Sequence, residues 1–242
     1  MMRYFLDTVE TIPDGVGFSH FDGLHLAWLT GFLLFAIFSC AYYRRHPEHR
    51  TRIRRGFALA ILADEVFLMA GLLMGGNFRA NYLPLELCSI NVFLILWHAW
   101  HPGELLDNFL YAVCLPGAVL ALLFPDWVNM PLGNFLHIHS FTLHILLAVY
   151  PMMLTFSGEI RPEIRVLPRC LALLMALATV ALGFNLVLGT NFMFLMYAPP
   201  GNPLGWFREH WGSHLLGFPV FLAAVVAVMY GPILLHRSQR TP

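Results

Sequence analysis

The chain has 242 residues, of which 58% are hydrophobic and 12% are charged. A soluble domain carries about 25% charged residues and about 45–50% apolar ones. This composition excludes a protein whose whole surface faces water. It predicts an integral membrane protein whose immediate partners are membrane lipids.

Apolar runs of about 20 residues, the length that spans a bilayer, recur between charged or Pro/Gly-rich segments. They predict an all-α transmembrane bundle of about seven helices that forms a single domain over residues 1–242. A six-helix bundle is the alternative, because the third run is short, holds Glu86 and could only dip into the membrane. The seven predicted helices cover residues 22–43, 56–75, 82–99, 104–124, 134–156, 169–189 and 213–235.

The arginines predict the orientation of the bundle. All 14 basic residues are arginine, and 11 of them fall on one side of a seven-helix bundle, six within the segment 44–55. Because cytoplasmic loops carry the excess of positive charge, the N-terminus is expected outside and the C-terminus in the cytoplasm. We interpret the arginine-rich segment as this signal. At most it contacts anionic lipid head groups, and no nucleic-acid partner is expected.

Polar residues at membrane depth indicate where a functional site lies. A charged group there costs about 2.5–3.5 kcal/mol on insertion scales, so such groups are functional candidates by default. In the predicted orientation most of them fall in the outer half of the bundle, which predicts a polar pocket toward the outer leaflet. The candidates are His25, Glu65, Glu86, Cys88, Asn91, His144, Asn185 and Asn191.

Cys88 is the candidate nucleophile. On an ideal helix Glu86 lies about 200° from Cys88, so a base must come from another helix. A thiol needs such a neighbouring base or a positive charge to react near neutral pH. His144 lies at a suitable depth in the fifth helix, with His137 or His139 behind it. Cys88 as a packing residue is the other interpretation.

The histidines of the fifth helix do not predict a metal site. His137 and His144 share a helix face, but about 10.5 Å separates them along the axis, so one ion cannot reach both. We expect no metal and no cofactor. The connection 190–212 is too apolar for a water-exposed loop, and its tryptophans are typical of the membrane interface. It is either an interfacial anchor or a lid over the pocket.

Three segments, taken together, resemble one family of membrane proteins: 83–88 (LPLELC), 144–147 (HILL) with Pro151 behind it, and 185–193 (NLVLGTNFM). From about residue 20 to 235 the chain resembles the bacterial YwaF-like integral membrane proteins. These in turn are similar to the animal transmembrane-protein-164 acyltransferases. The resemblance implies six or seven spans in the bacterial inner membrane and a distant relation to membrane hydrolases of fatty-acyl esters.

The resemblance also bears on single residues. In the animal branch a cysteine and a histidine are implicated in transferring an acyl chain to a lipid, and His144 is similar in context to that histidine. The animal motif has its cysteine directly after the proline, where this chain has Leu85. Cys88 instead follows the bacterial pattern, which usually shows a histidine where this chain has Glu86.

The first functional hypothesis is acyl transfer or acyl-ester hydrolysis. Cys88 attacks an ester carbonyl and His144 moves the proton. Glu86, Asn91 or Asn191 orients the histidine or polarises the oxyanion. The residues expected to bind substrate are Asn91, Asn185, Asn191, Glu65 and His25.

The second hypothesis is a small-solute transporter. Glu65, Glu86 and the interruption of the fourth helix at Pro116 favour it, because transporters place polar groups on broken helices near the midplane. The absence of an internal sequence repeat and the off-centre position of the polar residues count against it. No oligomeric state follows from the sequence.

Overall fold

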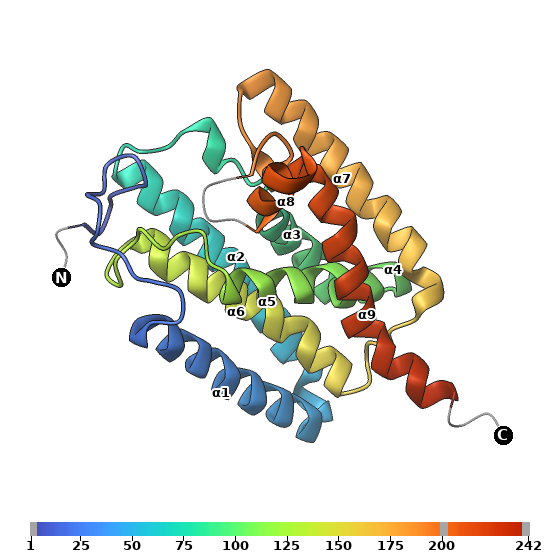
Figure 1. Ribbon diagram of the computed structural model, residues 1–242. Coiled ribbons are helices and arrows are strands. Elements are labelled where there is room, and N and C mark those ends of the chain that lie inside the picture. The colour runs from blue at the N-terminus through green and yellow to red at the C-terminus, as the bar shows by residue number, and fades with distance from the viewer. Residues whose placement is uncertain (1–3, 199–202, 239–242) are drawn as a thin grey trace.

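The computed structural model describes residues 4–198 and 203–238. Arg3 and Arg240, and residues 199–202 of the 190–212 connection, lie outside this described part. Within it the chain is all-helical and contains seven helical stretches long and apolar enough to cross a membrane. The predicted seven-helix bundle is confirmed (Figure 1). We call the end of the bundle that carries residues 50–55 the arginine end, and the opposite end the site end.

Most helix ends fall within a few residues of the predicted ones, with two exceptions. The second helix begins at Arg50 instead of residue 56, because arginine is a good helix former and the charged turn continues the apolar helix. The third begins at Leu87 instead of residue 82. The spanning elements are α1 (Gly23–Arg45), α2 (Arg50–Met74), α3 (Leu87–Trp100), α4 (Glu104–Phe109) continued by a π-helical turn (Leu110–Cys114) and α5 (Leu115–Leu123), α6 (Phe135–Phe156), α7 (Leu167–Leu188) and α9 (Gly217–Ser238).

The late start of α3 follows from Pro84. A residue before proline avoids the α conformation, and Leu83 is extended, with φ −61° and ψ 144°. Glu86 is extended too, at φ −67° and ψ 151°, so helical geometry begins only after it. The resulting helix has 14 residues and rises about 21 Å, less than the ~30 Å hydrocarbon core of a bilayer.

α6 is the central helix of the bundle. It packs against α1, α2 and α5, and 61% of the residues in its most apolar 18-residue stretch are buried. α7 and α9 lie at the rim (Figure 1), and only 11% and 6% of the residues in their most apolar stretches are buried. Side chains such as Val187 and Val228 are exposed there. In a membrane, lipid tails cover these surfaces.

Side-chain caps start two of the long helices. The Asn134 side-chain oxygen accepts the backbone N–H of Leu136 and begins α6. The Asp22 carboxylate accepts the backbone N–H of His25 and begins α1. Backbone hydrogen bonds from His25 and then Ser19 hold the pKa of Asp22 below its ordinary value of 3.8. Each cap satisfies N–H groups that the helix itself leaves free.

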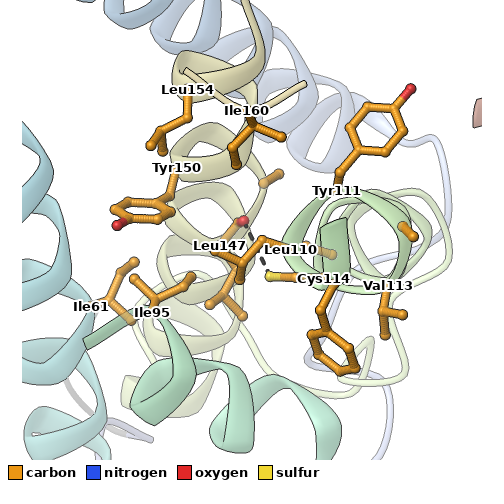
Figure 2. Packing of buried hydrophobic residues seen from close by; sticks show 14 of the residues in the cluster. Ile61, Ile95, Leu110, Tyr111, Val113, Cys114, Leu147, Tyr150, Leu154 and Ile160 are labelled. Atoms are coloured by element: carbon orange, nitrogen blue, oxygen red, sulfur yellow. Dashed lines mark hydrogen bonds between the residues drawn. The ribbon is translucent and has the colours of Figure 1, made fainter. Parts of the chain in front are cut away.

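A proline in α6 is compensated by a side chain from the π-helical turn. Pro151 has no N–H, so the carbonyl oxygen of Leu147, four residues earlier, loses its helical donor. The Cys114 thiol donates to that oxygen at 3.6 Å (Figure 2). Three residues before Cys114, the Tyr111 hydroxyl donates to the Met229 carbonyl at 2.6 Å and ties α9 to the core. The broken fourth helix therefore joins α6 and α9.

Candidate functional site

Polar side chains from α2, α3, α6 and the turn between α5 and α6 meet near the site end of the bundle. The first contact joins α2 to α6. His139 Nδ1 lies 3.0 Å from Asp64 Oδ2, and the Thr142 hydroxyl donates to Asp64 Oδ1 at 2.8 Å. Glu65, the next residue of α2, is within electrostatic reach of His139. These contacts fix the two helices against each other at the depth of the predicted pocket.

His144 is held in one orientation and one tautomer. Its Nδ1 lies 2.6 Å from the carbonyl oxygen of Ser140. A carbonyl only accepts hydrogen bonds, so Nδ1 carries the proton and Nε2 is left with its lone pair. The ring stacks on Trp127, with centroids 5.2 Å apart and planes 15° apart. The arrangement presents an imidazole nitrogen that accepts a proton.

Several buried polar atoms of α2, α3 and the turn before α6 have no hydrogen-bond partner among the described residues. They are both carboxylate oxygens of Glu65, Oδ1 of Asn91 and Nε1 of Trp127. The three residues are 5%, 3% and 8% exposed, respectively. Ser89 is close enough to interact with the Glu65 carboxyl group, but not with the geometry of a hydrogen bond. A buried unsatisfied group costs about 1–3 kcal/mol, so this concentration marks a place where a ligand can supply the missing partners.

Cys88 lies in the first turn of α3, half-buried, and packs against the core cluster. The groups within electrostatic reach of its thiol include Glu86, Glu65 and Asp126. No hydrogen bond joins its sulfur to a histidine in the described part of the chain. The pairing of Cys88 with His144 therefore stays a prediction.

The turn between α5 and α6 connects the surroundings of the two candidates. Asp126 lies within electrostatic reach of Cys88 and of Glu86, whereas the next residue, Trp127, stacks on His144. Sequence reasoning missed Trp127, because it lies outside every predicted helix. The available signal was an Asp-Trp pair directly after a proline, between two apolar runs.

Three predicted site residues hold the segment that follows α7. Glu86 Oε2 accepts the backbone N–H of Met193 at 2.8 Å. Asn185 accepts the N–H of Phe192 at 2.7 Å and donates to its carbonyl at 3.1 Å. Asn191 accepts two backbone N–H groups further along, at 2.9 and 3.1 Å. Each of these side chains bonds the backbone of this segment, and Asn185 also accepts from the Thr190 hydroxyl at 2.9 Å. The binding of substrate by the three residues stays a prediction.

The same segment carries backbone strain. Met193 and Phe194 have φ values of 56° and 54°, in the left-handed region that costs a non-glycine residue about 1–3 kcal/mol. Further along the chain, α8 (Leu204–Trp211) exposes Trp206 and Trp211. Exposed tryptophans fit the membrane interface, and the Glu86 contact joins the segment to the site.

His25 and His137 have both ring nitrogens occupied. His25 is fully buried, its Nε2 donates to the Leu122 carbonyl at 2.7 Å, and Nδ1 accepts a backbone N–H. His137 donates from Nδ1 to the Met130 carbonyl at 2.9 Å and accepts from Trp28 Nε1 at 2.9 Å. His137 thus offers no free nitrogen as an alternative base.

A family model described as the TMEM164 family matches residues 16–230, which is most of the chain. The protein belongs to the TMEM164 family. Membership agrees with the relation that the LPLELC, HILL and NLVLGTNFM segments indicate, while the YwaF-like subgroup stays a prediction. None of the curated proteins and none of the solved structures compared with the chain matches it.

This TMEM164-family protein has a second polar cluster, at the arginine end, which sequence reasoning did not single out. His98 is fully buried, and its two ring nitrogens lie 2.8 Å from the Tyr150 hydroxyl and 2.7 Å from Asp107 Oδ1. The cluster joins α3, α4 and α6. A histidine inside the apolar run FLILWHAW was the signal that could have found it.

Next to this cluster a carboxylate neutralises part of the arginine-rich segment. Glu159 accepts a hydrogen bond from the Tyr43 hydroxyl at 2.9 Å. Arg50 and Arg54 each approach the same carboxylate to 3.6 Å. These contacts fasten the ends of α1, α2 and α6 together, so the arginine end is closed by ion pairs and hydrogen bonds.

Proposed function

We propose that this protein is a membrane enzyme of acyl transfer or acyl-ester hydrolysis, with its polar site toward the outer leaflet of the bacterial inner membrane. The observation that carries the proposal is the tautomer of His144. Its Nδ1–H donates to the Ser140 carbonyl, so Nε2 is available as a general base beside the Trp127 indole, whose N–H has no partner among the described residues. The resemblance to the animal acyltransferases supports the same chemistry.

In the proposed first step, Cys88 acts as a neutral thiol that loses its proton as it attacks. The sulfur forms a bond to the ester carbonyl carbon, and His144 Nε2 takes the thiol proton. The carbonyl electron pair moves onto oxygen. When it returns, the bond to the alcohol breaks, and the leaving alcohol takes the proton from His144. A thioester on Cys88 and a free alcohol result.

In the second step an acceptor hydroxyl, from a lipid or from water, attacks the thioester carbonyl. His144 takes the hydroxyl proton and returns it to the sulfur as the thiol leaves. Glu65 and Asn91 suit the acceptor, because their unpartnered oxygens need a donor and a lipid hydroxyl supplies one. Glu86 acts on the site by holding the segment at Met193.

The test uses the purified full-length protein in lipid nanodiscs with a radiolabelled phosphatidylcholine and a lysophospholipid acceptor. Transfer of label is expected in the unmodified protein, together with a hydroxylamine-sensitive acyl adduct on Cys88. Cys88→Ser and His144→Ala should lose transfer. Cys114→Ala is the matched control, because Cys114 interacts with Cys88 but donates to a backbone carbonyl. Transfer that survives both Cys88→Ser and His144→Ala would contradict the proposal.

One observation favours the transporter as a second candidate. Glu65 is 5% exposed and neither carboxylate oxygen has a hydrogen-bond partner among the described residues. A proton or cation carried through the bundle would neutralise such a group. In proteoliposomes a transporter should lose solute uptake on Glu65→Gln while Cys88→Ser has no effect. An enzyme should instead lose turnover on Cys88→Ser.

A further inference from the structure

Trp127 has a buried hydrogen-bond donor with no acceptor in the described part of the chain. The residue is 8% exposed and its Nε1 has no partner, although a buried indole N–H normally finds one. Leaving such a donor unsatisfied costs about 1–3 kcal/mol. Glu65 and Asn91 also carry unpartnered buried atoms among the described residues, but these are oxygens, which accept.

The indole ring is fixed in place next to the general base. It stacks on His144, with centroids 5.2 Å and planes 15° apart. It meets Phe141 edge-on, at 5.2 Å and 86°. The neighbouring Asp126 is within electrostatic reach of Cys88. A rigid donor therefore lies on the turn that adjoins both the candidate base and the candidate nucleophile.

We propose that the Trp127 indole N–H donates a hydrogen bond to the ester carbonyl oxygen and stabilises the oxyanion that forms there; this rests on the proposed acyl-transfer function. As sulfur bonds to the carbonyl carbon and the thiol proton passes to His144, negative charge develops on that oxygen. The indole N–H meets the charge and keeps its own proton throughout. A preorganised donor in a water-poor site is most effective at this point of a reaction.

Carboxyl groups near the thiol give such a donor a further role. Glu65, Glu86 and Asp126 are within electrostatic reach of Cys88, and any of them that is ionised repels a developing oxyanion. A desolvated donor that has no acceptor in the described part of the chain gains a hydrogen bond when substrate binds. The unsatisfied N–H of the free protein is then relieved in the complex.

The experiment replaces each of two tryptophans that pack on Phe141 and compares the results. Trp127→Phe keeps a ring to stack on His144 and removes the N–H. With p-nitrophenyl palmitate as substrate for the protein in nanodiscs, kcat should fall by roughly 10²–10³-fold, the cost of one oxyanion donor. KM should stay within about threefold, because the lost bond strengthens only in the transition state. The thermal midpoint should not fall, because no hydrogen bond of the free protein is lost.

Trp28→Phe is the matched control. Trp28 stacks on Phe141 at 4.8 Å and 1°, but its N–H donates to His137 Nε2 at 2.9 Å. Removing that N–H breaks a hydrogen bond of the folded protein, so the thermal midpoint should fall while kcat stays unchanged. The two variants are expected to separate a role in catalysis from a role in stability.

Two results would overturn the assignment of Trp127. The first is an unchanged kcat in Trp127→Phe while Cys88→Ser and His144→Ala abolish turnover, which leaves the enzyme function standing. The second is a Raman indole N–H band of Trp127, identified by its loss in Trp127→Phe, that does not shift when a long-chain acyl trifluoromethyl ketone is added. Absence of turnover in the unmodified protein would overturn the enzyme function and the role of Trp127 together.

Discussion

His98 and His144 lie toward opposite ends of the bundle, each among buried polar groups, and they differ in what their ring nitrogens contact. Both nitrogens of His98 have side-chain partners, Tyr150 and Asp107. His144 has one backbone partner, and beside it the Trp127 N–H has no acceptor among the described residues. A satisfied network makes a core rigid, whereas unsatisfied groups remain costly until a ligand binds. Polar residues at membrane depth therefore do not all indicate function equally: an unsatisfied group indicates a ligand site, and a satisfied network indicates a structural role.

The largest expected effect is on turnover at His144. His144→Gln keeps a polar side chain but removes the proton acceptor, so kcat should fall by roughly 10²–10⁴-fold, the usual contribution of a general base. The measurement is acyl release by the protein in nanodiscs, normalised to the folded fraction. A fall in kcat of the same size in a His98 variant, at equal folded fraction, would remove the distinction between the two histidines.

The next effect is on stability at His98. His98→Ala leaves the Tyr150 hydroxyl and the Asp107 carboxylate without their partner, which should cost about 3 kcal/mol of unfolding free energy. Reversible unfolding in mixed micelles with increasing SDS measures it. Turnover per folded molecule should be unchanged. A His98→Ala protein as stable as the unmodified one would show that this network does not hold the bundle.

Two buried tyrosines give a smaller and more selective comparison. Tyr150→Phe removes a hydroxyl bonded to His98 and should cost about 1 kcal/mol. Tyr230 is also buried, but its hydroxyl has no partner among the described residues, so Tyr230→Phe should be neutral or slightly stabilising. The same SDS titration measures both. Equal losses would mean that hydroxyl burial, and not the hydrogen bond, sets the stability.

The smallest effect is expected at Asp22, which belongs to neither cluster. Its pKa is lowered by the backbone N–H of His25, so its contribution to stability is present above the unfolded pKa. That contribution is lost as pH falls through the lower folded value. Asp22→Ala should lower the thermal midpoint slightly at pH 7, and the difference should vanish in strong acid. Asp22→Asn, an equally good cap, should show no loss at pH 7.

Apolar runs separated by charged or Pro/Gly-rich segments predicted the fold well, because a membrane helix is recognised from its own residues. Seven apolar runs gave seven spanning stretches. The missed details depend on local backbone geometry, such as the delay of α3 imposed by Pro84. The π-helical turn at Leu110–Cys114 packs against α6. This packing depends on the partner helix, so no comparable pattern in the sequence predicts the turn.

The site was less predictable, because depth does not tell which side chains face each other. Glu86, Asn185 and Asn191 fall at suitable depth, yet their hydrogen bonds go to the backbone after α7. The Glu86 contact joins residues 107 positions apart, and no local pattern encodes it. Trp127 was missed for the converse reason: it sits in a turn, and only its stacking on His144 shows that it belongs to the site.

The shortness of α3 has a consequence for the bilayer itself. A helix of 14 residues is about 9 Å shorter than a ~30 Å hydrocarbon core. Lipids adapt to such a hydrophobic mismatch by local thinning, at a fraction of a kcal/mol per Å. On the proposed function, we expect thinning beside α3 to bring the glycerol ester region of the leaflet toward Glu86 and Cys88, at the start of that helix. A lipid ester would then reach the level of the site while its tails stay in the membrane.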